Sequence, residues 1–107
     1  MTFEQLSYFI AIVENDTFFD AACEMNISQS SLSKQIMKLE KELDLTLFDR
    51  TTRSATLTQA GEFFYNEAKQ LIEHYKLTLE NIENFKSLHE KKLHIAVLPI
   101  QTQYNLN

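Results

Sequence analysis

Apolar residues recur at helical spacing over most of the 107-residue chain. This pattern predicts four helices, at about residues 2–13, 18–25, 28–43 and 59–89. The single glycine and single proline agree with a mainly α-helical protein, because both residue types interrupt helices and are frequent in turns. Between the second and third helices stands Asn26, a residue that tolerates the left-handed backbone conformation found just after many helices.

The segment of residues 18–37 has the pattern of two short helices joined by a tight turn. Ala21 and Ala22 are small enough to let the two helices approach closely, as a helix-turn-helix requires. Ile27 places an apolar side chain in the turn, and Ser28 can cap the next helix by accepting one of its first free N–H groups. We therefore predict a helix-turn-helix at about residues 18–37.

The third helix has two different faces. Its apolar face is formed by residues at spacings of four, three and four, namely Leu32, Ile36, Leu39 and Leu43. The other side carries small, amide-bearing and basic residues, namely Gln29, Ser30, Ser33, Lys34 and Lys38. Such a helix can pack on a core and present its polar face to a DNA groove. An ordinary helical hairpin with a solvated polar face is the alternative interpretation.

Residues 44–57 lack a helical pattern and predict a two-stranded wing, with residues 47–50 paired to residues 55–57. Two isolated strands are only marginally stable, so apolar residues of the wing must pack on the helices. Arg50 and Arg53 stand near the predicted hairpin tip, where cations can contact DNA phosphates or the minor groove. A solvated loop is the alternative interpretation for these two arginines.

The fourth helix contains a heptad pattern of apolar positions. Ten residues form or widen the pattern: Phe64, Tyr65, Ala68, Leu71, Ile72, Tyr75, Thr78, Leu79, Ile82 and Phe85. A helix of this length reaches about 46 Å, which exceeds the ~27 Å diameter of a head of some 60 residues. Part of the apolar face would therefore stay in water in a monomer, and we predict a dimer. The expected dimerisation residues are Phe64, Ala68, Leu71, Ile72, Tyr75, Leu79, Ile82 and Phe85.

The charge distribution favours a nucleic-acid interface only in the middle of the chain. The net charge is −5, which by itself argues against DNA binding. However, residues 1–27 hold five acids and no Lys or Arg, whereas residues 28–54 hold five Lys and Arg against four acids. Contact with phosphates depends on this local patch and not on the sum over the chain.

Other features limit the possible functions. The histidines lack the HExxH spacing of a metal site, and we expect neither an enzyme nor a cofactor. A single cysteine cannot form an internal disulfide, which fits a reducing cytoplasm. A redox-sensor role for Cys23 is disfavoured because no nearby cation would stabilise its thiolate. We expect no signal peptide and no membrane contact, because no apolar run approaches the ~20 residues that span a bilayer.

Residues 93–98 form a nearly continuous apolar run, as in a strand that is buried on both faces. The remaining residues cannot supply the rest of a sheet, so we expect residues 91–107 to be the start of a truncated α/β domain. A short natural protein with an exposed apolar tail is the alternative.

The order of these motifs resembles that of the LysR-type transcriptional regulators. The resemblance covers about residues 1–98 and depends on several short motifs taken together. In chain order these are Phe9, Thr17-Phe18, Ala21-Ala22, Ile27-Ser28-Gln29, Leu32-Ser33-Lys34-Gln35-Ile36, Leu39-Glu40, Leu43, Leu47-Phe48-Asp49-Arg50 and Leu57-Thr58-Gln59-Ala60-Gly61. It implies a winged helix-turn-helix at residues 1–58, a dimerising linker helix at residues 59–90, and the beginning of an effector-binding α/β domain at residues 91–107.

The resemblance also implies a function, namely sequence-specific binding of double-stranded DNA as a dimer, at an interrupted palindrome, to regulate transcription. The predicted DNA contacts are Ser28, Gln29, Ser30, Ser31, Ser33, Lys34, Lys38, Arg50, Thr51 and Arg53. A small-molecule effector would bind only in the missing domain, and pairing of dimers into tetramers stays open. A helical protein-interaction module that never contacts DNA is the alternative, motivated by the acidic total charge and the heptad pattern.

The chain departs from the usual family pattern at four positions of the expected interface, one of which is Asp20, where the family often has a neutral or basic residue. Ser30 stands where a proline is common, and Lys34 stands where an arginine is common. A lysine cannot make the planar two-pronged contact with guanine that an arginine makes. Phe19 replaces a residue that is usually small and polar, which could alter contact with the DNA backbone at the start of the second helix.

Overall fold

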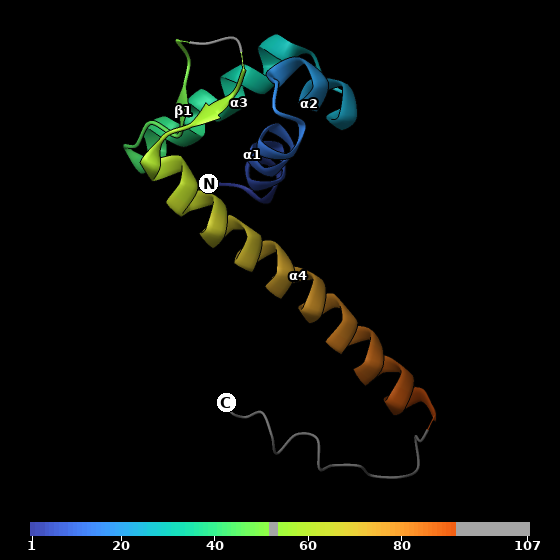
Figure 1. Ribbon diagram of the computed structural model, residues 1–107. Helices are drawn as coiled ribbons and strands as arrows, with labels where there is room; N and C mark the ends of the chain where they lie inside the picture. Colours follow the sequence, from blue (N-terminus) through green and yellow to red (C-terminus); the bar gives the residue numbers. More distant parts are fainter. Residues whose placement is uncertain (52–53, 92–107) are drawn as a thin grey trace. The chain divides into compact units, whose positions relative to one another are not determined.

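The structure, a computed structural model, describes residues 1–51 and 54–91. It confirms the predicted mainly α-helical fold, in which three helices and a two-stranded wing precede a long helix (Figure 1). The elements are α1 (Phe3–Asn15), α2 (Phe18–Met25), α3 (Gln29–Leu43), β1 (Phe48–Asp49), β2 (Thr56–Leu57) and α4 (Gln59–Lys91). The chain divides into two compact units, Met1–Glu73 and His74–Asn107, and each is described by itself. The predicted strand at residues 93–98 lies outside the described residues.

Helix α1 begins with a capping box formed by Thr2 and Gln5. The hydroxyl of Thr2 accepts the N–H of Gln5 at 3.0 Å, and the Gln5 side chain accepts the N–H of Thr2 at 3.1 Å. The helix continues to Asn15, two residues beyond the prediction. It ends there because Asp16 adopts the left-handed conformation, with φ of 66°, and donates its N–H to the carbonyl of Ile12.

The helix-turn-helix lies at the predicted place. Asn26 ends α2 in the left-handed conformation, with φ of 59°, as its residue type predicts. The hydroxyl of Ser28 accepts the N–H of Ser31 at 3.1 Å and starts α3. A side-chain hydrogen bond of 3.1 Å from Gln5 of α1 to Gln35 of α3 adds a polar link between these two helices.

The core of the first unit is organised around the fully buried ring of Phe9. Its centroid lies 5.3 Å from that of Phe48 in the wing and 4.9 Å from that of Phe64 in α4. Such tilted and edge-on ring pairs each add about 0.5–1.5 kcal/mol beyond burial itself. The buried apolar residues are Leu6, Phe9, Ala11, Ile12, Ala21, Ala22, Leu32, Ile36, Leu39, Leu47, Phe48, Phe64 and Ala68.

The wing is antiparallel, with Phe48 opposite Leu57 and Asp49 opposite Thr56. Each strand is only two residues long, shorter than predicted. Phe48 is buried in the core, which ties this small sheet to the helices as expected.

Helix α4 starts under the chain that leads into the wing. The hydroxyl of Thr58 accepts the N–H of Gly61 at 2.9 Å and donates to the carbonyl of Thr46 at 2.5 Å, and the backbone N–H of Thr58 donates to the carbonyl of Leu47 at 3.0 Å. Gly61 is buried, and a β-carbon at this position would overlap the carbonyl oxygen of Leu47. The start of α4 therefore requires a residue without a side chain.

Two of the expected dimerisation residues lie in the core of the first unit. Phe64 is 8% exposed and Ala68 is fully buried, because both pack against the helical head of their own chain. Leu71, by contrast, is 47% exposed, and Ile72 is partly buried against the core. At the beginning of α4, Phe64 and Ala68 of the heptad pattern therefore pack into the core of their own chain.

The described part of the second unit is helical, and its described side chains at residues 74–89 are all exposed. Among them are four of the expected dimerisation residues, Tyr75, Leu79, Ile82 and Phe85. An ion pair of 3.5 Å joins Lys86 to Glu83 one turn away.

Candidate nucleic-acid interface

Helix α3 buries its apolar face and exposes its polar face, as its sequence predicts. Leu32, Ile36 and Leu39 are fully buried. Most of the predicted contact residues on this helix and its cap are exposed, namely Ser28, Gln29, Ser30, Ser31, Lys34 and Lys38, and Ser33 is half-buried. The structure therefore leaves this side of α3 free for a partner.

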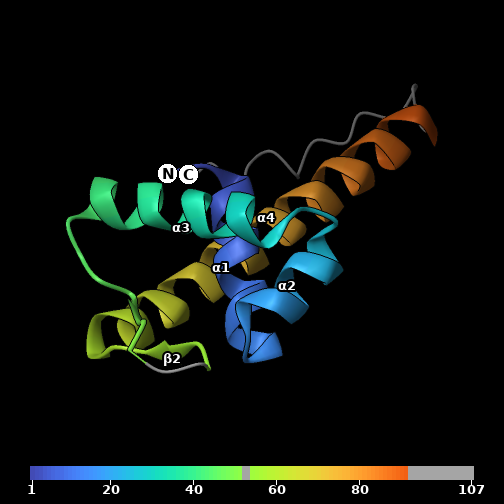
Figure 2. The same cartoon turned by 90° about the horizontal axis from the view of Figure 1, so that it is seen from above.

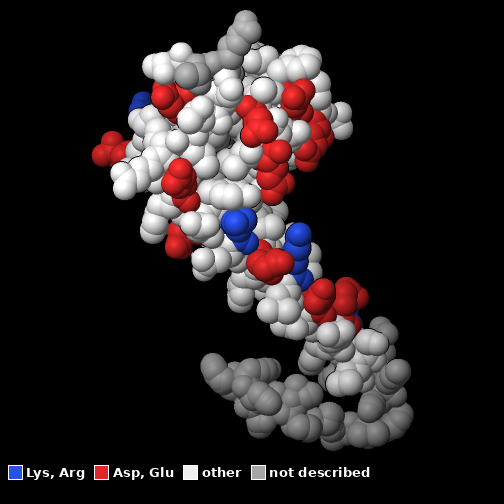
Figure 3. All heavy atoms as spheres, viewed as in Figure 1, with Lys and Arg blue, Asp and Glu red and all other residues white. Residues whose placement is uncertain are grey.

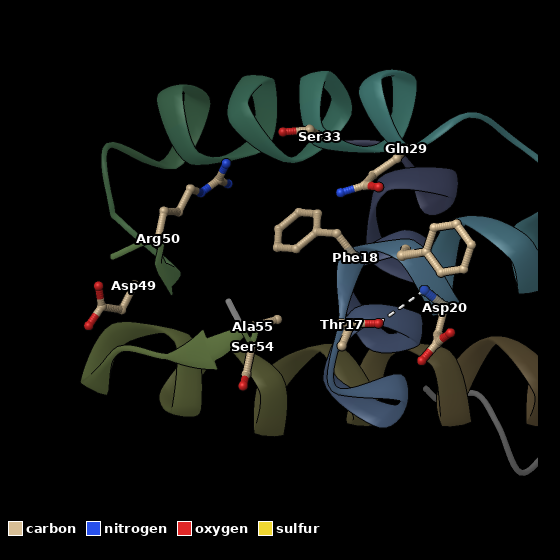
Figure 4. Close-up of a pocket in the computed structure, with 10 residues that line it drawn as sticks. Thr17, Phe18, Asp20, Gln29, Ser33, Asp49, Arg50, Ser54 and Ala55 are labelled. Atoms are coloured by element: carbon tan, nitrogen blue, oxygen red, sulfur yellow. Dashed lines mark hydrogen bonds between the residues drawn. The ribbon is translucent and has the colours of Figure 1, made fainter. Parts of the chain in front are cut away.

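A hollow of about 550 Å³ adjoins the exposed face of α3. Figure 2 shows α2 and the wing along the same side of α3, and the hollow lies between these three elements. The lining residues are Thr17, Phe18, Phe19, Asp20, Gln29, Ser33, Asp49, Arg50, Ser54 and Ala55. In Figure 4 the amide of Gln29 points from α3 into this hollow. The fold thus brings Gln29, Ser33 and the wing residue Arg50 together, although they are distant in the sequence.

Arg50 is held by two contacts in the first unit. One guanidinium nitrogen lies 3.1 Å from the carboxylate of Glu40 on α3, and the guanidinium stands 5.2 Å from the ring centroid of Phe18. The other carboxylate oxygen of Glu40 accepts the N–H groups of Leu47 at 2.8 Å and Phe48 at 3.2 Å. Glu40 therefore anchors the entry to the wing and partly neutralises the charge of Arg50.

The described part of the wing tip is occupied by a small turn. Both the N–H and the hydroxyl of Thr51 donate to the carboxylate of Asp49, at 3.0 and 2.7 Å. The hydroxyl bond, followed by the backbone bond, lowers the pKa of Asp49 below its ordinary value. The turn at Thr51 therefore favours the charged form of Asp49. The predicted contact residue Arg53 lies outside the described residues.

Two residues of this surface were missing from the predicted contact set. Met37 is 54% exposed on α3, and Phe19 is 61% exposed in the first turn of α2. Helical spacing could have identified Met37, because it follows Ser33 by four residues and Lys34 by three. The family resemblance marked Phe19 as unusual at the expected interface, but spacing along the chain does not reveal that it lines the hollow, which depends on how α2 packs against α3.

The surface charge agrees with the distribution along the sequence. On the face seen in Figure 3, acidic side chains gather over α1 and α2. Among the residues that the structure describes, no group of three or more His, Cys, Asp and Glu could hold a metal ion. No helix within the described ranges is both long enough and apolar enough to cross a membrane.

Comparison with known proteins identifies one family for the helical head. A protein-family model, described as "Bacterial regulatory helix-turn-helix protein, lysR family", matches residues 3–62 of the chain. Among curated proteins, the chain is 38% identical over 98 residues to the uncharacterized HTH-type transcriptional regulator YbhD of Escherichia coli (strain K12), a match that covers 92% of this chain and 31% of that protein. It is 34% identical over 106 residues to the DNA-binding transcriptional dual regulator OxyR of the same strain, covering 99% and 35% of the two chains.

Solved structures are similar over about four-fifths of the chain. The BenM DNA-binding domain in complex with catB site 1 DNA matches with a TM-score of 0.80 and 36% identity, covering 83% of this chain and 96% of that one. The CbnR DNA-binding domain in complex with DNA matches with a TM-score of 0.77 and 31% identity, covering 80% and 99%. The chain spans about a third of the length of the curated relatives it matches.

Proposed function

Since the chain belongs to the LysR family of bacterial regulatory helix-turn-helix proteins, whose members are transcription regulators and not enzymes, we propose that it binds double-stranded DNA sequence-specifically and thereby regulates transcription. One observation carries the proposal: the exposed polar face of α3 adjoins the hollow that Gln29 and Ser33 share with the wing residue Arg50. The complexes of the similar BenM and CbnR domains with DNA support it. A bacterial transcription regulator acts on the chromosome, which agrees with the expected cytoplasmic location.

In this proposal the N-terminal half of α3 enters the major groove. The amide of Gln29 has the donor and acceptor needed to bind N6 and N7 of an adenine. Lys34 supplies a point charge to a base edge or a phosphate, and Lys38 supplies one to a phosphate. Ser28 and Ser31 contribute less to base contacts, because the hydroxyl of Ser28 already accepts the N–H of Ser31 and donates to its hydroxyl at 2.9 Å.

The wing would contact the backbone beside the groove. A guanidinium has five N–H donors, so Arg50 keeps donors for a phosphate while it is bound to Glu40. Thr51 and Arg53 are proposed to contact the same flanking backbone. These contacts position the protein on the duplex and carry little sequence information of their own.

Salt dependence tests the proposal directly. Four basic residues in each subunit, Lys34, Lys38, Arg50 and Arg53, give at most eight phosphate contacts in a dimer. The slope of log K against log salt should therefore be about −5 to −7, with the smaller value expected if Glu40 keeps Arg50 from a phosphate. The measurement is fluorescence anisotropy of a duplex selected from a random pool, with a scrambled duplex as control. A slope near zero, or equal affinity for both duplexes, would contradict the proposal.

We further propose that two chains pair through the exposed apolar residues of α4, so that two helix-turn-helix heads read an interrupted palindrome. Four such residues in the second unit, Tyr75, Leu79, Ile82 and Phe85, are 46–59% exposed. Burying each large apolar side chain gains roughly 1.5–3 kcal/mol. Phe64 and Ala68 are left out of this proposal, because their own head already covers them.

A charge on this apolar face should separate the dimer. Ile82→Asp removes one apolar contact from each subunit and should weaken dimerisation by about a hundredfold or more. Sedimentation equilibrium of the 107-residue chain measures the change. Leu77→Asp is the matched control, since Leu77 is 50% exposed on the same helix but lies off the heptad pattern. The dimer proposal fails if the wild-type chain is a monomer, or if both variants weaken dimerisation equally.

A further inference from the structure

Phe19 is a large apolar side chain that the fold leaves in water. It is 61% exposed, although Phe18 beside it packs against the core. Leaving a phenylalanine exposed forgoes roughly 1.5–3 kcal/mol of burial. Phe19 also lines the hollow together with Gln29 and Ser33 of α3. An apolar ring therefore stands beside polar side chains that are proposed to contact bases.

The charges around Phe19 disfavour a phosphate at this place. Asp20 and Asp49 line the same hollow, and the charge of Arg50 is partly neutralised by Glu40. The N-terminus of α2 would ordinarily attract an anion. Here the hydroxyl of Thr17 already accepts a hydrogen bond from the N–H of Asp20 at 3.0 Å. The Asp20 carboxylate also offsets the partial positive charge at the N-terminus of α2. A neutral group fits this corner of the hollow better than a phosphate.

The major groove offers one apolar group to such a ring, which is the methyl group of thymine. We propose that Phe19 contacts a thymine methyl at the base pair read by Gln29 or at the one next to it, and so contributes to sequence specificity. Side chains that share one hollow can reach the same or adjacent base pairs, because base pairs are spaced about 3.4 Å along the helix axis. This inference rests on the proposed DNA binding.

A uracil scan of a bound duplex tests the inference, because uracil keeps every hydrogen-bonding group of thymine and lacks only the methyl. Each thymine of a selected duplex is replaced in turn, and affinity is measured for the wild-type 107-residue chain and for Phe19→Ala. At one thymine per half-site, uracil should weaken wild-type binding about fourfold, the effect of roughly one buried methylene. The Phe19→Ala variant should bind the thymine and uracil duplexes equally at that position.

Phe63→Ala is the matched control, because Phe63 is also exposed, at 66%, but does not line the hollow. This variant should keep the wild-type sensitivity to uracil. Circular dichroism melting of Phe19→Ala confirms that the fold is retained. The inference is overturned if no thymine shows the effect in the wild-type chain, or if Phe19→Ala keeps it. The proposed function survives either result as long as the wild-type chain prefers the selected duplex, and fails only if that preference is absent.

Discussion

Replacing Gly61 by alanine is expected to destabilise the helical head by about 2–4 kcal/mol, the range of a severe overpacking change. At an unhindered position inside a helix the same change would stabilise by up to ~1 kcal/mol. The sign reverses here because the added methyl would overlap the carbonyl oxygen of Leu47 and lie 2.8 Å from the Leu57 side chain. The backbone leading into the wing would have to move away from α4, and the bond between Thr58 and Leu47 would be strained or lost.

Thermal and urea unfolding of Gly61→Ala measures this loss of stability. Gln59→Ala is a suitable control, since Gln59 is exposed in the same first turn of α4 and alanine is a good helix former. We expect the control to change the free energy of unfolding by less than ~0.5 kcal/mol. A Gly61→Ala variant as stable as the wild-type chain would show that α4 does not pack as closely under the wing as the structure indicates.

Replacing Glu40 by alanine is expected to cost about 3 kcal/mol of stability, because one carboxylate serves three donors. The backbone N–H groups of Leu47 and Phe48 would lose their acceptor, and Arg50 would lose its ion pair. Leu47 and Phe48 are buried, so their N–H groups would be only partly compensated by water. The Arg50 side chain is 35% exposed, so the ion pair itself contributes the smaller part.

Glu40→Gln separates these contributions. The amide oxygen can still accept from the backbone, so we expect less than half of the loss caused by alanine.

Both variants release Arg50, and its full charge then becomes available to phosphates. Non-specific DNA binding should therefore strengthen, and the salt slope should steepen by about one contact per subunit. Urea unfolding and anisotropy titration measure the two effects. Unchanged stability in Glu40→Ala would contradict the anchoring role of Glu40, and an unchanged slope in Glu40→Gln would show that Arg50 already contacts a phosphate while it is paired with Glu40.

The helix boundaries of the head were predictable because they depend on neighbouring residues. Thr2, Ser28 and Thr58 each accept an N–H three residues ahead, and Asn26 adopts the left-handed conformation, as their residue types indicate. The buried face of α3 was predictable for a related reason, since the helical repeat places residues three and four apart on one side. These predictions needed no knowledge of where other elements lie.

The division of the heptad pattern in α4 was not predictable in the same way. Phe64 and Ala68 have the same spacing as Ile82 and Phe85, yet the first pair is buried in the head and the second pair is exposed. Spacing specifies which side of a helix is apolar, but it does not specify which partner covers that side. The role of Glu40 was not predictable either. Its position one residue after a core leucine does not reveal that Leu47, Phe48 and Arg50 donate hydrogen bonds to its carboxylate.

The sequence by itself determined the four helices, their caps, the wing and the polar face of α3, because each depends on contacts between residues close together in the chain. Only the tertiary structure decided that Gln29, Ser33, Phe19 and Arg50 share one hollow, that Glu40 holds Arg50, and that Gly61 touches the chain before the wing. These features depend on the directions in which separate elements pack, and close packing of a core determines those directions only when all the elements are present.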